Sequence, residues 1–150
     1  MEAKLNANLH EYGQCLFGLG GEYLEAGEAL HRGENTKWLP MYFLICHSLE
    51  LSLKSFLSER GYSEKKLKNI GHSIEKCLKE AEKNGLNVSL IQSDRLNLMK
   101  FDGHYSAKNL EYFYNIEKIF PNIEKMINIT KILRIQIFNS ITEREFEGMR

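Results

Sequence analysis

The sequence predicts an all-α fold, an antiparallel bundle of about five helices, from three observations. Apolar side chains recur at alternating spacings of four and three residues, which is the period of a helix face. No segment shows the apolar–polar alternation that is typical of a half-buried strand. Residues 39–61 form an apolar run that is longer than ordinary strands and is bounded by helix signals. Because 150 residues suffice for one core, we expect residues 1–150 to form a single domain.

The first predicted helix covers residues 3–31. Its apolar or small face is formed by Leu5, Leu9, Tyr12, Leu16, Leu19, Tyr23, Ala26 and Leu30. The segment also holds five glycines, each of which costs a helix about 1 kcal/mol relative to alanine. We therefore expect close packing against another helix, or else a break near Gly20 and Gly21. A phosphate-binding loop is disfavoured at this point, because such loops follow a strand and none is readable upstream.

The second predicted helix lies in the apolar run of residues 39–61 and continues to about Arg60, and it carries three polar side chains in one stripe. His47, Glu50 and Lys54 are spaced i, i+3 and i+7 on a helix that is otherwise apolar almost all round. Such a helix lies inside a protein, where ionised groups need partners. We favour a structural network, in which Glu50 pairs with Lys54 and His47 hydrogen-bonds into the core. The alternative is a ligand site, in which Glu50 orients His47 and Lys54 binds a phosphate.

Local start and stop signals predict the other boundaries. Thr36 is a possible N-cap of the second helix, and Gly61 is its expected stop. A short helical turn is expected from Ser63. The next helix is expected to be capped by His72 or by the adjacent Ser73. It should end at Asn84-Gly85, where Leu86 makes the hydrophobic contact of a glycine-capped C-terminus. The remaining predictions are a helix over residues 89–101 with Leu90, Ile91, Leu98 and Phe101 buried, a turn at Asp102-Gly103, a helix over residues 122–141, and a charged, frayed tail from about residue 142.

Composition argues against several classes of protein. Twenty basic and twenty acidic residues cancel, so a general polyanion binder is not expected and no DNA-binding role is predicted. Charged residues interrupt the apolar run of the second helix, so no membrane span is predicted. Cys15, Cys46 and Cys77 lie far apart without zinc-site spacing. We expect each cysteine to be buried, which fits a protein of the reducing cytoplasm. No signal peptide, metal site or cofactor is expected.

Two motifs carry a resemblance to a known family. Residues 47–57 read HSLELSLKSFL, which matches the pattern H-x-x-E-L-x-L-K-x-x-L, and Gly61 follows soon after. The segment Gly71-His72-Ser73-Ile74, with Leu78, Ala81 and Gly85 after it, is similar to the pattern G-H-x-L…L…A…G. Over about residues 38–86 the chain therefore resembles the HEPN-domain proteins of prokaryotes.

The resemblance implies a bundle of four or five helices that often dimerises. HEPN proteins occur with nucleotidyltransferase partners, in toxin–antitoxin pairs and in phage defence. Many are metal-independent ribonucleases, whose signature is Arg, four to six further residues and then His on a late helix. In this chain the nearest arrangement is Arg134 with Asn139 in the place of His. Because Asn cannot act as a general acid or base near neutral pH, ribonuclease chemistry is expected to be lost or severely reduced.

The leading hypothesis is therefore a degenerate or non-catalytic HEPN-like module. It would act as a homodimer in a toxin–antitoxin, phage-defence or nucleotidyltransferase-associated system, with a nucleotidyltransferase or an antitoxin as a possible partner.

Two alternatives stay open. One is a metal-independent ribonuclease with a non-standard arrangement, for which Arg134, Asn139 and His104 are the candidate residues. His104, with Tyr105, Lys108, Tyr112 and Tyr114 near it, could stack RNA bases beside a phosphate contact, although a core or dimer interface is the favoured role of these aromatic residues. The other alternative is a nucleotide- or small-ligand-binding bundle, for which the candidates are His47, Glu50, Lys54 and His72.

Overall fold

The computed structural model describes residues 2–33, 38–106 and 121–149, and these residues form helices and no strand. The helices are α1 (Glu2–Arg32), α2 (Trp38–Glu59), α3 (Glu64–Ile70), α4 (Ile74–Lys83), α5 (Gln92–Ser106) and α6 (Ile123–Gly148). The predicted all-α class is confirmed. The described ranges hold six helices rather than about five, because the short turn expected from Ser63 is the helix α3.

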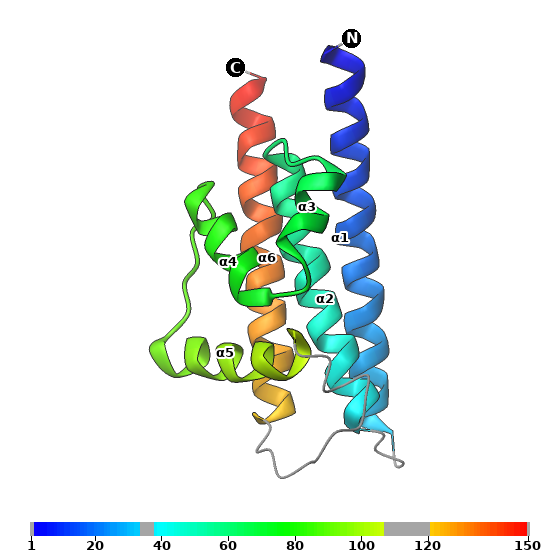
Figure 1. Ribbon diagram of the computed structural model, residues 1–150, viewed down its shortest axis with the longest axis vertical. Coiled ribbons are helices and arrows are strands. Elements are labelled where there is room, and N and C mark those ends of the chain that lie inside the picture. Colours follow the sequence, from blue (N-terminus) through cyan, green and yellow to red (C-terminus); the bar gives the residue numbers. More distant parts are fainter. Residues whose placement is uncertain (1, 34–37, 107–120, 150) are drawn as a thin grey trace.

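Three long helices, α1, α2 and α6, lie side by side along the long axis of the molecule (Figure 1). α1 runs away from the end at which both chain termini lie, whereas α2 and α6 run towards it, so the bundle is not antiparallel throughout. α3 and α4 lie beside α2, and α5 crosses the lower half of the bundle in this view. α2 contacts each of the other five helices, which makes it the centre of the fold.

α2 is buried almost all round, as its sequence predicts. Its fully buried apolar side chains are Ile45, Cys46, Leu49, Leu53, Phe56 and Leu57. They form one core with residues that include Leu24 of α1 and Leu133 and Ile137 of α6. Because burying a large apolar side chain contributes roughly 1.5–3 kcal/mol, α2 is the main source of hydrophobic stabilisation.

α1 approaches α2 closely at its glycines and does not break at Gly20. A Cβ on Gly20 would lie 2.8 Å from the Ser52 Oγ and 3.1 Å from the Ser48 carbonyl oxygen. Ser48 uses the short distance to donate its hydroxyl to the Gly20 carbonyl oxygen at 2.6 Å. The expected inward position of Leu19 is wrong, since its side chain is 45% exposed. The buried face of α1 follows the glycines because α2 leaves no room there for a larger side chain.

The predicted caps of the middle helices are confirmed. The hydroxyls of Ser63 and Ser73 accept hydrogen bonds from backbone N–H groups in the first turns of α3 and α4. Gly61 and Gly85 have φ angles of 94° and 96°, a conformation that glycine adopts without strain. After α4, the Leu86 N–H donates to the Ala81 carbonyl oxygen at 3.0 Å, and the Leu86 side chain is buried as expected.

The predicted turn at Asp102-Gly103 is wrong, because α5 continues through both residues to Ser106. Asp102 is only 5% exposed and reaches the start of α4. Its Oδ1 accepts from the Ile74 N–H at 2.6 Å, and its Oδ2 accepts from the Ser73 hydroxyl at 2.9 Å. Asp102 thus caps a neighbouring helix instead of beginning a turn. At the other end of α5, Ile91 was expected to be buried but is 67% exposed.

Two further expectations fail at the surface. Cys46 and Cys77 are buried as predicted, but Cys15 is exposed on the side of α1 that faces away from the core. α6 does not end near Ile141, and helix continues through the charged segment to Gly148. This part of α6 has a neighbour, since Glu145 Oε1 lies 3.7 Å from His10 Nε2 of α1. The proposed N-cap Thr36 lies outside the described residues.

Candidate functional site

The polar stripe of α2 is organised around the carboxylate of Glu50, which is 2% exposed. Lys54 Nζ donates to Glu50 Oε1 at 2.7 Å, and His72 Nδ1 lies 3.0 Å from the same oxygen. The Tyr105 hydroxyl donates to Glu50 Oε2. The pair that the sequence predicts between Glu50 and Lys54 is therefore present, and α5 and the start of α4 supply the other partners.

His47 joins the same network through Tyr105. Its Nδ1 lies 3.0 Å from the Tyr105 hydroxyl and 3.7 Å from Glu50 Oε2. Aromatic rings hold the imidazole in place, with Tyr23 edge-on at a centroid distance of 4.6 Å and Phe43 stacked at 5.6 Å. The expected hydrogen bond of His47 into the core is thus made to Tyr105.

Glu50 is held in its ionised form. Burial by itself raises the pKa of a carboxyl group, because the charged form loses its hydration. Here the donors of His47, Lys54 and Tyr105 outweigh that effect, and the pKa of Glu50 falls from an ordinary 4.5 to about 2. A carboxylate with so low a pKa is a weak base, and its oxygens are already occupied by donors. These contacts are those of an internal network rather than of a general base.

The other ligand candidate, His72, does not cap α4. Ser73 does so, with its hydroxyl accepting from the Lys76 N–H at 3.2 Å. His72 turns to Glu50 instead, which places one largely exposed imidazole at the edge of the buried network.

His104 lies in the last turn of α5, next to the Tyr105 that binds Glu50. Its neighbours in the proposed RNA-stacking group, Lys108, Tyr112 and Tyr114, lie outside the described residues. The imidazoles of His47 and His72 both lie close to Glu50, and no group of three or more His, Cys, Asp or Glu in the described ranges is arranged to hold a metal ion.

Arg134, the candidate from the ribonuclease motif, is half-buried between α1, α2 and α6. Its Nη1 donates to the Phe17 carbonyl oxygen at 3.0 Å and to the Ser52 Oγ at 2.8 Å. Its guanidinium also lies over the Phe17 ring, 4.0 Å from the centroid. Burial lowers the pKa of Arg134, with the charge of Glu25 acting in the opposite direction. Arg134 therefore holds three helices together.

Asn139 is exposed on α6. It lies five positions after Arg134 on the helix, a rotation of about 140° around the helix axis at 3.6 residues per turn. The two side chains thus leave the helix in different directions, and in this chain they are not brought together as one site.

Tyr105 and Asp102 are the residues of these networks whose roles the sequence did not reveal. The signal for Tyr105 was indirect: a buried carboxylate needs more donors than one lysine, so a further donor had to come from another element. For Asp102 the sequence pointed to the wrong structure, since Asp followed by Gly is typical of a turn rather than of a helix interior.

Comparison with models of known protein families gives no match, and comparisons with curated proteins and with solved structures give none either. Within the described ranges, no helix has both the length and the apolar character needed to cross a membrane.

Proposed function

We propose that this chain is a HEPN-like, non-catalytic interaction module that works as a homodimer. The observation that carries the proposal is an apolar groove between α1 and α6. Phe17 and Leu24 of α1 line it together with Ile135 and Phe138 of α6. Ile135 is 60% exposed and Phe138 is 54% exposed. Large apolar side chains that gather in an exposed groove are typical of a surface that binds a protein partner.

A second apolar pocket lies next to this groove along the same two helices, and the two share Phe17 and Phe138 in their linings. The second pocket lies towards the chain termini and is lined by Gly13 and Gly18 of α1 and Ile141 of α6. The rings of Phe17 and Phe138 face each other across it, with centroids 6.2 Å apart. An elongated apolar groove of this kind accommodates the face of a helix.

A second copy of the chain suits the groove because its two walls carry opposite charges. The α1 side exposes Glu25, whose charge acts on Arg134, whereas Lys131 of α6 lines the groove and reaches Glu28 of its own α1 at 3.0 Å. In a two-fold dimer, the α1 wall of one copy meets the α6 wall of the other, and the reverse contact follows by symmetry. Both charge contacts are then favourable, and a formal net charge of zero adds no repulsion between copies.

The surroundings of Arg134 support a non-catalytic role. An arginine that stabilises a transition state must be free to bind the reacting phosphate. Arg134 is instead bonded to Phe17 and Ser52 of its own chain, and Asn139 supplies no acid or base. The chain would then serve its nucleotidyltransferase, toxin–antitoxin or defence system through binding.

Light scattering after size-exclusion chromatography tests the homodimer. The expected mass is twice the 17.5 kDa of one chain. A protein that stays at 17.5 kDa at every concentration would remove the proposal.

An RNA-cleavage assay in the presence of a chelator tests the absence of catalysis. We expect no cleavage above the buffer control. Strong cleavage that Arg134→Ala abolishes, while the folded state is retained, would show that the ribonuclease alternative is correct.

A further inference from the structure

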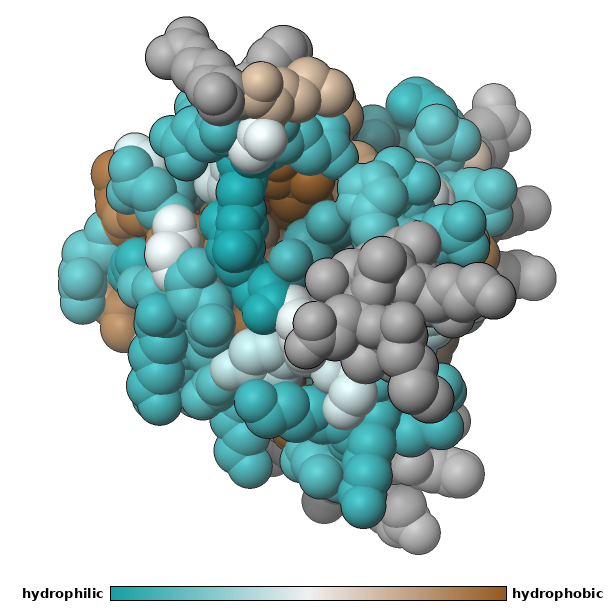
Figure 2. All heavy atoms as spheres, turned by 90° about the horizontal axis from the view of Figure 1, so that it is seen from above, coloured by the Kyte–Doolittle hydropathy of each residue, from teal (hydrophilic) through white to brown (hydrophobic). Residues whose placement is uncertain are grey.

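A polar cleft lies towards the end of the bundle at which both chain termini lie, away from the network of Glu50. Its volume is about 490 Å³, and its lining is formed by Arg60, Asn84, Gly85, Ser140, Glu143, Arg144 and Glu147. Seen from this end, the described surface is hydrophilic over most of its area (Figure 2). A cleft of roughly 300–1,000 Å³ is large enough for a small organic ligand.

Arg60 has hydrogen-bonding capacity that the described residues do not use. Its Nε donates to the Asn84 carbonyl oxygen at 3.1 Å, and its guanidinium lies over the Phe56 ring, 4.4 Å from the centroid. Its Nη1 is buried and has no hydrogen-bond partner among the described residues. A buried donor left unpaired costs on the order of 1–3 kcal/mol, more when it is charged, so a small shift of the Arg60 guanidinium that brings Nη1 to an acceptor in the cleft would be stabilising.

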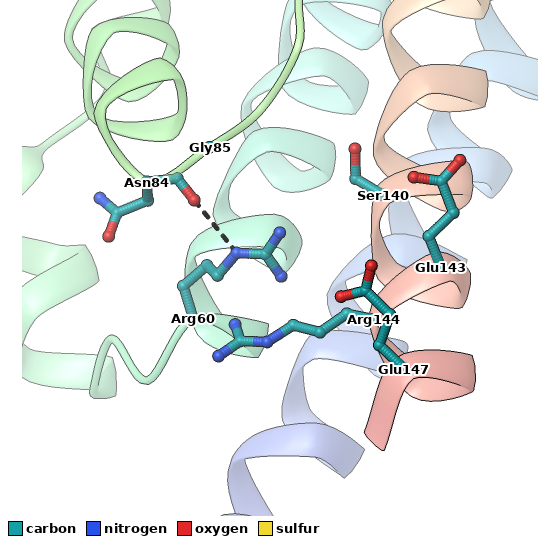
Figure 3. A pocket seen from close by; sticks show the side chains of 7 residues that line it. All are labelled: Arg60, Asn84, Gly85, Ser140, Glu143, Arg144 and Glu147. Atoms are coloured by element: carbon teal, nitrogen blue, oxygen red, sulfur yellow. Dashed lines mark hydrogen bonds between the residues drawn. The ribbon is translucent and has the colours of Figure 1, made fainter. Parts of the chain in front are cut away.

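Arg144 reaches across from α6 towards Arg60, so that two guanidinium groups share the cleft (Figure 3). Burial lowers the pKa of Arg60, and the nearby charge of Arg144 lowers it further, while the charge of Glu59 acts in the opposite direction. Glu59, the carboxylate next to Arg60 in sequence, pairs with His10 at 2.9 Å instead. No carboxylate of the described residues forms an ion pair with either arginine of the cleft. Two cations that repel each other, neither of them in an ion pair with a described residue, constitute a site for an anion.

We propose that this cleft binds a small phosphate monoester that carries hydroxyl groups, with the phosphate between Arg60 and Arg144. Planar guanidinium groups match the oxygens of a phosphate in a bidentate manner. Ser140, whose hydroxyl also lines the cleft, supplies a further donor. This inference is independent of the groove between α1 and α6.

The two glutamates of the cleft decide the class of ligand. Glu143 and Glu147 are exposed on α6, on either side of Arg144 in sequence. Carboxylates repel a phosphate but accept hydrogen bonds from hydroxyl groups, so a ligand needs both kinds of group to suit the whole cleft. A sugar phosphate meets this requirement, whereas inorganic phosphate satisfies only the arginines.

Isothermal titration calorimetry with ribose 5-phosphate tests the proposal. We expect saturable binding of one molecule per chain, weaker binding of inorganic phosphate and none of ribose. Arg60→Gln and Arg144→Gln should each weaken the binding of ribose 5-phosphate roughly tenfold or more, because each removes a charge-assisted contact. Glu147→Gln should strengthen the binding of inorganic phosphate, because it removes a repulsive charge.

The matched control is Arg95→Gln. Arg95 pairs with Glu82 at 3.1 Å outside the cleft, so its loss removes the same charge from the chain and should leave the affinity unchanged. Arg144 is exposed, so Arg144→Gln decides the matter even if Arg60→Gln fails to fold. Absence of saturable binding to the native protein, or equal weakening by Arg95→Gln, would overturn the proposal. Inorganic phosphate binding as tightly as ribose 5-phosphate would overturn the assigned ligand class.

Discussion

Replacing Glu50 with glutamine should change how the stability of the protein depends on pH. The fall in the pKa of Glu50 from 4.5 to about 2 corresponds to about 3 kcal/mol, at about 1.4 kcal/mol for each unit. Because the folded-state pKa is the lower one, this stabilisation is fully present above the unfolded-state pKa and is lost as the pH falls towards the folded-state value. The native protein should therefore lose about 3 kcal/mol from this group between about pH 5 and pH 2.

Urea denaturation followed by far-UV circular dichroism at a series of pH values measures this effect. At neutral pH, Glu50→Gln should lower the free energy of unfolding by about 3 kcal/mol, because it leaves the buried Lys54 without its anion. Between about pH 5 and pH 2, the difference between the native protein and the variant should shrink towards zero. Parallel pH curves for the two proteins would refute the account of Glu50.

The matched control is Glu75→Gln. Glu75 pairs with Lys79 at the same i, i+4 spacing and at 2.9 Å, but on the exposed side of α4. Exposed pairs of this kind contribute about 0–1 kcal/mol, so this variant should show little change at any pH. A loss as large as that of Glu50→Gln would mean that burial is not the reason for the strength of the Glu50 network.

Two further substitutions test the packing of the bundle by urea denaturation. Gly20→Ala should lower the free energy of unfolding by roughly 1–3 kcal/mol, because the new Cβ would lie 2.8 Å from the Ser52 Oγ. Gly103→Ala should raise the free energy of unfolding by up to about 1 kcal/mol, because a Cβ there has nothing within 4 Å. Equal effects of the two would contradict close α1–α2 packing. Asp102→Ala should cost about 2 kcal/mol by leaving the buried Ile74 N–H unpaired, and an unchanged stability would show that this cap is dispensable.

The parts of the fold that local chemistry determines could be predicted from the sequence. A serine that caps a helix, or a glycine that ends one, acts on backbone groups within a few residues of itself. The sequence therefore predicts the roles of these residues at helix ends, and they are Ser63, Ser73, Gly61 and Gly85. It also predicts that α2 is buried. The ion pair between Glu50 and Lys54 could be predicted for the same reason, since both residues lie on one helix.

Features that depend on a distant partner could not be predicted in this way. Asp102 looks like the start of a turn until its partner Ile74, 28 residues away, is known. The apolar pattern of α1 placed Leu19 inside, whereas the close approach of α2 places Gly20 there. The resemblance to the ribonuclease motif likewise made Arg134 a candidate catalytic residue, and only the fold shows its contacts with α1 and α2.

The central claim, that the groove between α1 and α6 joins two copies of the chain, is tested most directly by sedimentation equilibrium of two matched variants. Ile135 of the groove and Ile91, the residue before α5, are both exposed, at 60% and 67%, so a glutamate at either position leaves the core intact. We expect Ile135→Glu to sediment as a 17.5 kDa monomer, while Ile91→Glu sediments like the native dimer. A dimer that survives Ile135→Glu, or that Ile91→Glu dissociates equally, would contradict the claim.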